Sequence, residues 1–390
     1  MKTRYLFSYS FAAALLLLLT QATPVAAQIE QPLDSALNAR IDSIARWEMG
    51  RQDIIGMAVA VIQGGKIAFV NAYGYSDWES QKPVTLESEF RWASMSKSLT
   101  SVAAARLQEQ GLLVMDTFVN AYVSGWPDST MRVRQLLQNR SGIGHYNELD
   151  RLYPIWKKNL RQYKPDTLWN AQKAISIFKG TPLAFMPDSS HMYSTFGFIL
   201  AGAVVDQIGQ ANLGLSYLGL VHQFIVQPFG LLSLKPDFQT DLNPNEVKGY
   251  YRDRKGDIRQ RKDDDVSWKI PGGGYQSNIM DLAKYVQALM QRKVLRPESF
   301  QPLWTRQPDW DYGMGFEVRG EGSEFQVAHS GSQTKTRTIF EFYPNRQLGV
   351  AVMCNSEWAN PSQVAERLIE TLRAAEQGAG ASALPGSKKK

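Results

Sequence analysis

The sequence predicts a mixed α/β (α+β) fold, in which an antiparallel sheet flanked by helices is completed by strands from both ends of the chain. Short apolar runs typical of strands occur at residues 55–75 and return from residue 313 to 354. Between about residues 94 and 300 the apolar residues recur with mainly helical spacing, which predicts an inserted all-helical region. A catalytic cleft is then expected where the sheet meets this helical region.

The composition is that of one large folded domain. The chain has 390 residues, of which 44% are hydrophobic and 21% charged, which is ample material for a sizeable core. We expect the domain to span residues 28–376. Its α/β part is expected at about 28–90 and 305–376, and its helical part at about 91–304.

The N-terminus has the pattern of a secretory signal peptide at residues 1–27. Lys2 and Arg4 precede an apolar run at 11–19, and small residues follow up to Ala27, where a signal peptidase would cut. The run is too short to span a bilayer comfortably, so a stable membrane anchor is disfavoured. We therefore expect a secreted or periplasmic protein.

The first elements of the domain are an amphipathic helix and a hairpin. Apolar residues recur at helical spacing from residue 34 to 49, and Asp34 is a suitable N-terminal cap. Two apolar runs follow at 55–62 and 66–75. Gly64 and Gly65 join them and supply the positive φ that a tight hairpin needs, so the runs are predicted to form an antiparallel pair.

Periodicity also predicts the later elements. Helical spacing recurs in five stretches, at 96–110, 132–139, 168–178, 195–208 and 279–291. Strand-like runs and a closing amphipathic helix follow at 315–319, 325–329, 336–343, 349–354 and 360–374. Residues 377–390, rich in Gly, Ala and Ser, have little to bury and are expected to form a flexible tail.

Charge, cysteine and histidine content disfavour several classes of protein. The formal net charge of the chain is +6, but Lys2, Arg4 and three lysines at 388–390 lie outside the expected domain. The net charge of the domain itself is therefore about +1, which does not support a nucleic-acid partner. The single Cys354 excludes an internal disulfide, and its apolar neighbours predict a buried strand. Four histidines lack the spacing of a zinc site, so we expect no metal and no other cofactor.

Ser94 and Lys97 are the first candidate catalytic pair. Their Ser-x-x-Lys spacing also begins at Ser176, Ser332 and Ser387, so the context decides between the matches. A helical pattern follows Ser94, which places its hydroxyl at a helix N-terminus and the Lys97 amine on the same face. A serine hydroxyl needs an adjacent base, and a lysine provides one when burial or another cation lowers its pKa. An ordinary helix cap is the alternative interpretation.

Three motifs resemble those of the class C β-lactamase and penicillin-binding-protein family. Phe90–Thr100 resembles the nucleophile motif of the family. His191–Gly197 is similar to its Tyr-x-Asn element, and His329–Gly331 to its Lys-Thr-Gly element in a His-x-Gly form. Residues 136–143 and 271–274 give supporting matches.

The resemblance extends over about residues 34–374, with the motifs in the family's order. Within the family, residues 96–100, 141–146 and 193–197 resemble the mitochondrial serine β-lactamase-like proteins and their bacterial relatives. The resemblance implies that the expected sheet and helical region adopt the serine β-lactamase/transpeptidase-like arrangement.

The family's roles can be carried over to matching positions. The resemblance implies that Ser94 is the acylated nucleophile, that Lys97 shares its proton, and that the Tyr193 phenol transfers protons to the leaving group and the deacylating water. It further implies an oxyanion hole formed by the backbone N–H groups of Ser94 and Ser332. His329 would face the cleft and orient or polarise the substrate.

Departures from the family pattern affect substrate recognition. Thr195, Ser330 and Gly331 fall at positions implied to bind substrate, but Thr195 replaces an asparagine and offers one hydroxyl instead of an amide. His329 replaces a lysine, and a histidine is mostly neutral above about pH 6.5, so it attracts a substrate carboxylate less. We therefore expect weak or no β-lactamase activity.

The leading functional prediction is an exported serine hydrolase that forms an acyl-serine intermediate. The expected substrate is a small molecule, peptide, amide or ester, including peptidoglycan-derived peptides, and the activity is expected to resemble that of a D-amino-acid peptidase or esterase. The alternative is a binding or polymer-forming structural protein that retains the hydrolase fold. The sequence leaves the oligomeric state and self-assembly open.

Overall fold

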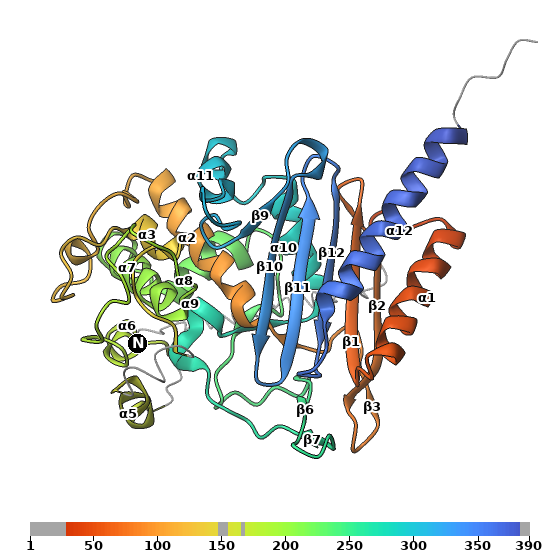
Figure 1. Ribbon diagram of the computed structural model, residues 1–390, viewed down its shortest axis with the longest axis horizontal. Coiled ribbons are helices and arrows are strands. Elements are labelled where there is room, and N and C mark those ends of the chain that lie inside the picture. Colours follow the sequence, from red (N-terminus) through yellow and green to blue (C-terminus); the bar gives the residue numbers. More distant parts are fainter. Residues whose placement is uncertain (1–28, 147–154, 165–167, 383–390) are drawn as a thin grey trace, which may run out of the picture.

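The computed structural model describes residues 29–146, 155–164 and 168–382. A seven-stranded antiparallel sheet has the order β3-β2-β1-β12-β11-β10-β9 (Figure 1). Its strands are β1 (Gly56–Gln63), β2 (Lys66–Asp77), β3 (Lys82–Pro83), β9 (Glu317–Arg319), β10 (Gln326–Gln333), β11 (Thr336–Tyr343) and β12 (Leu348–Cys354). The central pair joins the two ends of the chain, because Val59 of β1 lies opposite Val352 of β12. The predicted fold class is therefore confirmed.

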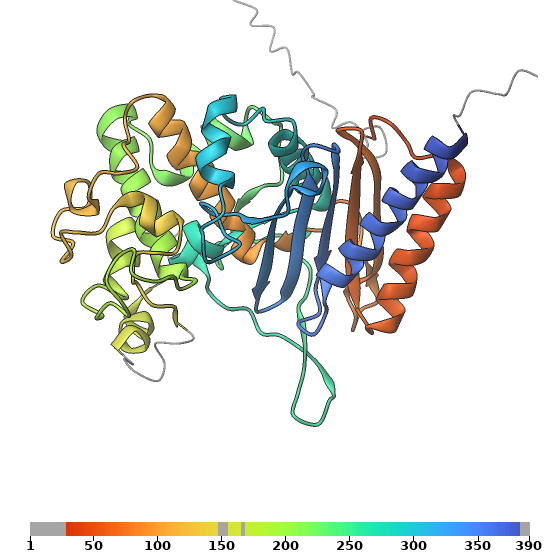
Figure 2. The same ribbon diagram turned by 45° about the horizontal axis from the view of Figure 1, so that its top comes forward.

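Two helices from the chain ends cover one face of the sheet. α1 (Ser35–Arg51) and α12 (Pro361–Ser382) lie side by side across it, as both views show (Figures 1 and 2). Ile41 and Leu368, from these helices, share a buried cluster with apolar side chains of the sheet. Asp34 caps α1 as predicted, since its side chain accepts the backbone N–H of Leu37 at 2.9 Å. Cys354 is buried in the same cluster.

The opposite face packs against α10 (Ile279–Met290) and the helical region. The sequence placed residues 279–291 in the helical part, and this assignment is wrong, because α10 packs directly on β1, β11 and β12. Its buried stripe includes Val286 and Met290, whose side chains contribute to the larger of the two core clusters. A stripe of this kind fits a sheet or a helix equally well, so periodicity could not identify its partner.

The remaining helices form the layer that carries much of the candidate site. Within the described part of the chain they are α2 (Ser96–Glu109), α3 (Val133–Leu137), α5 (Ile155–Gln162), α6 (Ala171–Ser176), α7 (Thr195–Leu213), α8 (Tyr217–Val221) and α9 (Ile270–Gly273). α11 (Phe300–Trp304) lies apart from this layer, with Trp304 against Phe342 of β11. α7 is buried along most of its length and contacts α2, α3, α6, α8 and α9, which makes it the central helix of the layer. No single helix among the described residues is long and apolar enough to cross a membrane. α7 and the following segment Tyr217–Val226 reach that length and hydropathy only together, and the two are bent by 82° relative to each other.

Among the residues that the structure describes, five short strands lie outside the main sheet. They are β4 (Phe90–Arg91), β5 (Lys235–Pro236), β6 (Tyr250–Arg252), β7 (Ile258–Gln260) and β8 (Tyr275–Ser277). β4, β8 and β5 form a small sheet, and its strand β4 directly precedes the turn that carries Ser94. Strands of two or three residues are too short to produce alternation, so the sequence analysis did not find them.

The C-terminal helix is longer than expected. α12 reaches Ser382, so the prediction of a flexible tail from residue 377 is wrong for residues 377–382. Gln377, Ala379 and Ala381 within this stretch have high helix propensity, which outweighs the two glycines between them. The expected signal peptide and residues 383–390 lie outside the described residues.

Candidate active site

Ser94 lies in a single turn, Ala93–Met95, directly before α2. The turn is held from both sides: the Trp92 N–H donates to the Tyr275 carbonyl at 2.7 Å, and the Trp92 carbonyl accepts the Thr338 hydroxyl at 3.2 Å. Ala93 has a φ of 47°, a left-handed conformation that strains a residue with a side chain. The fold thus holds Ser94 at the start of a helix in a strained, well-anchored turn.

Strand β10 passes close to this turn at Gly331. A Cβ atom on Gly331 would overlap both the Trp92 carbonyl oxygen and the Thr338 hydroxyl. The absence of a side chain therefore permits the close approach of β10 to the nucleophile turn. Gly331, predicted to bind substrate, is buried and sets the spacing between these two elements.

Replacing Gly331 with alanine should destabilise the protein by about 1–3 kcal/mol, because the added methyl group overpacks this contact. Urea unfolding would measure the change, and labelling of Ser94 by an acylating probe should weaken as the turn shifts. Gly50→Ala is the matched control, since a Cβ there meets nothing within 4 Å. Equal stability of Gly331→Ala and Gly50→Ala would contradict the packing argument.

Lys97 is fully buried one turn after Ser94. Its Nζ lies 3.1 Å from Ser94 Oγ, 3.3 Å from Thr195 Oγ1 and 2.6 Å from the Gly272 carbonyl oxygen. Burial lowers the pKa of Lys97 well below its usual value, and the positive charge of Lys269 lowers it further. A neutral amine beside a serine hydroxyl can accept its proton.

Tyr193 comes from the segment that precedes α7. Its neighbour Ser194 fixes this segment: the Ser194 N–H donates to Asn139 Oδ1 at 2.9 Å, and its hydroxyl caps α7 by accepting the Gly197 N–H at 3.0 Å. The Tyr193 hydroxyl lies beside the Ser94 side chain. Burial raises the pKa of Tyr193, so the phenol stays protonated at neutral pH.

The three predicted side chains therefore meet at one point. Lys97 Nζ lies 4.7 Å from the centre of the Tyr193 ring, and both groups contact the Ser94 hydroxyl. This places a nucleophile, an amine whose pKa is lowered and a protonated phenol together. Such a set can activate the hydroxyl and supply a proton to a leaving group.

Thr195 does not have the surroundings expected of a substrate-binding residue. It is 2% exposed, its hydroxyl accepts a hydrogen bond from Lys97, and its N–H donates to His145 Nδ1 at 3.2 Å. The polar groups of Thr195 are thus paired within the protein, where its hydroxyl contacts Lys97. Its expected role in binding substrate stays a prediction.

Ser330 and Ser332 are both exposed on β10. The Ser330 N–H and hydroxyl donate to Glu317 Oε1 at 3.3 and 3.1 Å. Ser332 lies opposite Arg337 in the β10–β11 pair, in the part of β10 that packs against the Ser94 turn. These two serines can thus reach a molecule bound beside β10.

His329 is only 1% exposed, although it lines a pocket together with Tyr193. Its Nδ1 lies 2.7 Å from the Ser330 carbonyl oxygen and its Nε2 3.2 Å from the Tyr312 hydroxyl. These partners fit a neutral ring that donates from Nδ1 and accepts at Nε2. Burial lowers the pKa of His329 to about 4, with the charge of Lys97 adding to the effect and Glu317 opposing it.

We predict that His329 stays neutral between pH 5.5 and 8, because its pKa of about 4 lies below this range. The carbon-bound proton of its ring should keep a constant NMR chemical shift over this interval, and a His329→Gln variant would assign the signal. An inflection of that shift near pH 6.5 would show that the ring is solvated and would contradict the buried geometry.

Several site residues were missed by the sequence analysis. Lys269, which lowers the pKa of Lys97, itself has a pKa lowered to about 8, mainly by burial. His145 contacts Thr195, and Tyr312 contacts His329. His145 lies in a segment noted only for its resemblance, and Lys269 shortly precedes another such segment; Tyr312 had no local signal.

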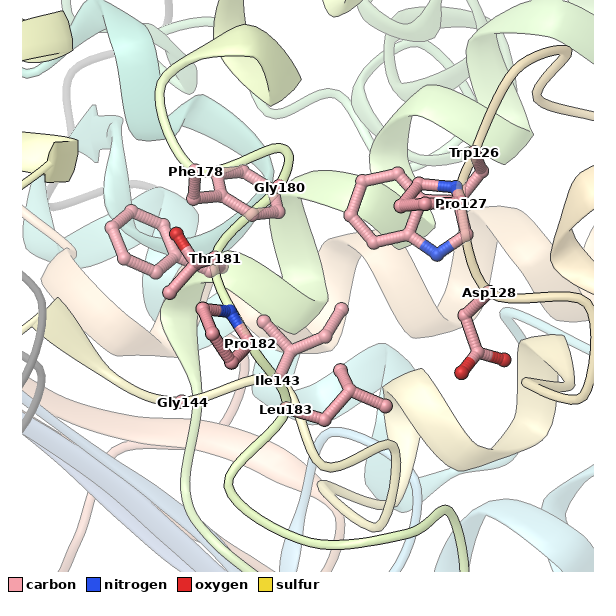
Figure 3. Close-up of a pocket in the computed structure, with 11 residues that line it drawn as sticks. Trp126, Pro127, Asp128, Ile143, Gly144, Phe178, Gly180, Thr181, Pro182 and Leu183 are labelled. Carbon is pink, nitrogen blue, oxygen red and sulfur yellow. The ribbon is translucent and has the colours of Figure 1, made fainter.

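Two pockets flank this constellation. A pocket of about 770 Å³ is lined by Tyr193, His329 and Ser330. A smaller pocket of about 270 Å³ has a mainly apolar lining, with the rings of Trp126 and Phe178 on opposite sides (Figure 3). Gly144 lines this smaller pocket, and its carbonyl oxygen accepts a hydrogen bond from the Ser194 hydroxyl. The smaller pocket therefore adjoins the segment that carries Tyr193. Among the described residues, no group of three or more His, Cys, Asp or Glu side chains could hold a metal ion.

The fold and the site together define a serine hydrolase of the kind that recognises penicillins, with a serine and a lysine one helical turn apart and a tyrosine beside them. The Beta-lactamase family model matches residues 41–374, and the chain belongs to this family.

Known relatives agree with this assignment. The chain is 26% identical over 406 residues to the mitochondrial serine beta-lactamase-like protein LACTB of Homo sapiens, covering 77% of this chain and 73% of the relative. It is 27% identical over 331 residues to Esterase EstB of Burkholderia gladioli, covering 75% and 80%. The crystal structure of D-amino acid amidase from Ochrobactrum anthropi SV3 in complex with L-phenylalanine amide superposes with a TM-score of 0.73 at 20% identity, covering 87% and 99%. The predicted family resemblance is confirmed.

Proposed function

We propose that the protein hydrolyses an amide or ester through an acyl intermediate on Ser94. The observation that carries this proposal is the 3.1 Å contact between Ser94 Oγ and the fully buried Lys97 Nζ, with the Tyr193 phenol beside the same serine. In the first step Ser94 Oγ bonds to the substrate carbonyl carbon, and Lys97 accepts the hydroxyl proton. The tetrahedral intermediate collapses as the leaving group departs with a proton delivered from Tyr193.

The second half of the reaction uses the same groups in reverse. Water attacks the acyl-serine carbonyl carbon and gives a proton to the Tyr193 phenolate left by the first half, and Ser94 Oγ leaves with the proton that Lys97 holds, so both groups regain their starting states. The backbone amides of Ser94 and Ser332 are proposed to stabilise the oxyanion in both steps, since β10 packs against the Ser94 turn. Lys269 contributes by keeping the Lys97 amine neutral.

The substrate class is proposed as an ester or an amide without a β-lactam carboxylate. Two similar proteins bear the names esterase and D-amino acid amidase. In this chain His329 is neutral at pH 7 and Thr195 is engaged with Lys97, so neither supplies the fixed charge or free amide that would hold a β-lactam. The family's β-lactam chemistry is therefore expected to be weak here.

The test is covalent labelling followed by a substrate comparison. A fluorophosphonate probe should add its mass to Ser94 of the full chain, and p-nitrophenyl esters should be turned over faster than nitrocefin. A folded protein that no acylating probe labels would support the binding or structural alternative. Nitrocefin turnover above ester turnover would overturn the interpretation of Thr195 and His329.

We propose that the hydrolase is exported, on the support of the charged, apolar and small-residue pattern within residues 1–27. After expression in a bacterial host, mass spectrometry should find a mature chain that begins at Gln28. A charge in the apolar run, Leu17→Arg, should leave the uncut chain in the cytoplasm. Cytoplasmic retention of the unaltered chain would contradict export.

A further inference from the structure

Charged side chains connect three segments of the chain near the Ser94 turn. The first is β4, whose Arg91 lies three residues before Ser94. The second is the turn between β10 and β11, which begins two residues after Ser332. The third is the segment 263–265, whose Asp264 bonds to both of the others. One carboxylate thus connects the segment of the nucleophile with that of a proposed oxyanion donor.

Arg91 anchors the first of these segments in the interior. Its side chain is 3% exposed, and its Nε lies 2.6 Å from Oδ2 of Asp237, which is 4% exposed. Its Nη1 donates to Asp264 Oδ1 at 2.5 Å, and its Nη2 donates to the Asp264 carbonyl oxygen at 3.0 Å. A buried guanidinium needs such partners, because an unpaired buried charge is strongly unfavourable. Asp264 is therefore held by its side chain and its backbone to a fixed point beside the nucleophile turn.

The same carboxylate reaches the turn that follows β10. The Thr334 hydroxyl donates to Asp264 Oδ2 at 2.5 Å. The next residue, Lys335, is buried and pairs with Glu246 at 2.8 Å, so both residues of the turn are anchored. Residues of one strand keep fixed offsets, and the position of Thr334 therefore sets that of Ser332.

Asp264 also acts on Lys269, the cation that lowers the pKa of Lys97. Burial lowers the pKa of Lys269 to about 8, and the charge of Asp264 is the largest influence that opposes this shift. The other groups that act on Lys269 or face its amine are Arg91, Asp237, Asp265, Tyr146, Trp268 and the neutral ring of His145. The negative charge at residue 264 thus keeps Lys269 charged near neutral pH, and through it keeps the pKa of Lys97 low.

We propose that Asp264 is a positioning residue for the hydrolytic reaction, which sets the spacing between the Ser94 turn and β10 and maintains the charge of Lys269. This inference rests on the proposed function, in which the backbone amides of Ser94 and Ser332 stabilise the oxyanion together. Asp264 acts through its neighbours and not on the substrate itself. A misplacement of about 1 Å far from the reacting atoms can lower a rate by about 100-fold, so a residue in this position has a large effect.

The first experiment removes the charge and keeps the shape. In the full-length enzyme Asp264→Asn should lower kcat for p-nitrophenyl acetate by about 10-fold to 100-fold and leave KM within about twofold, because the oxyanion forms only after binding. The acid limb of kcat/KM should also move to higher pH by about half a unit, since Lys269 loses charge and the pKa of Lys97 rises. A merely structural role would lower the urea midpoint without moving this limb.

Two further variants separate the hydrogen bond from the charge. Thr334→Val removes the hydroxyl that binds Asp264 but leaves the carboxylate, so kcat should fall while the acid limb stays in place. Asp264→Glu keeps the charge at a greater reach, so its acid limb should also match that of the unaltered enzyme. Both variants remain informative if Asp264→Asn does not fold.

Asp257→Asn is the matched control on the exposed β6–β7 hairpin. The Asp257 side chain is 55% exposed and pairs with Arg259 at 3.0 Å, so its loss should change neither kcat nor the acid limb. The proposal would be overturned by an unshifted acid limb or an unchanged kcat in Asp264→Asn, or by equal effects of Asp257→Asn and Asp264→Asn.

A titration that needs no turnover separates this proposal from the reaction. NMR of the labelled Lys269 side chain should show its pKa falling below about 8 in Asp264→Asn, and an unchanged value would contradict the role of Asp264. Failure of Ser94 to react with the fluorophosphonate would refute the proposed hydrolysis instead, while the titration would still decide whether Asp264 maintains the charge of Lys269.

Discussion

Alanine in place of Ser94 is expected to lower kcat for ester hydrolysis by about a million-fold, the size of loss seen when a serine nucleophile is removed. No acyl intermediate can form without the Oγ atom, and the two other groups of the site then have nothing to activate. The fold should survive, because Ser94 is only half-buried. Steady-state kinetics and intact mass after fluorophosphonate treatment would measure both effects.

A second serine of the same sequence pattern provides the control. Ser176 also has a lysine three residues later, but it is exposed, and its hydroxyl donates to the Lys173 carbonyl at 2.7 Å. Ser176→Ala should keep the rate and the labelling of the unaltered protein. Labelling that persists in Ser94→Ala would show that another residue is the nucleophile.

Methionine in place of Lys97 is expected to lower kcat/KM by about 100-fold to 10,000-fold, the usual contribution of a positioned base. Methionine has a similar length and no amine, so the hydroxyl loses its proton acceptor. The variant should be at least as stable as the unaltered protein, because it removes a polar group from a fully buried position. Urea unfolding and ester kinetics would test the two parts.

The pH dependence gives a separate test of the Lys97 assignment. The folded-state pKa of Lys97 lies well below its usual value of 10.5, so the unfolded chain binds more protons between the two values. The free energy of unfolding therefore falls as the pH drops through this window. Activity needs the neutral amine and falls as the pH drops through the folded-state pKa. Lys97→Met should lose both dependences, whereas Lys179→Met, at an exposed position, should keep them. If the residual activity of Lys97→Met still fell at low pH as it does in the unaltered protein, the assignment would be contradicted.

Local patterns predicted the parts of this site that are close in sequence. The spacing of three residues at the start of a helix is enough to bring Ser94 and Lys97 together, since residues one turn apart share a face. The alternation and periodicity of apolar residues likewise predicted β1, β2, β11, β12, α1 and α2 close to their observed bounds, and the starts but not the ends of β10, α7 and α12. Family resemblance then pointed to Tyr193, which no local pattern linked to Ser94.

Other features depend on contacts between distant segments. The contact of Thr195 with Lys97 could not be predicted from the sequence, and neither could the contact of His329, which lines the pocket beside Tyr193, with Tyr312. The partner of α10 and the positions of β4 to β8 also depended on such contacts. A sequence pattern gives the face on which a side chain lies but not the group that packs against it.

The sequence by itself determined the class of fold, the Ser94–Lys97 pair and the motifs that mark the family, because these depend on spacing within one element or on short continuous segments. Only the tertiary structure decided that Lys97 is fully buried and that the charge of Lys269 lowers its pKa. It also decided that Glu317, Tyr312 and His329 line one pocket with Tyr193. Burial and electrostatic fields arise from groups that the folded chain brings together from distant positions, and these set the pKa values on which the chemistry depends.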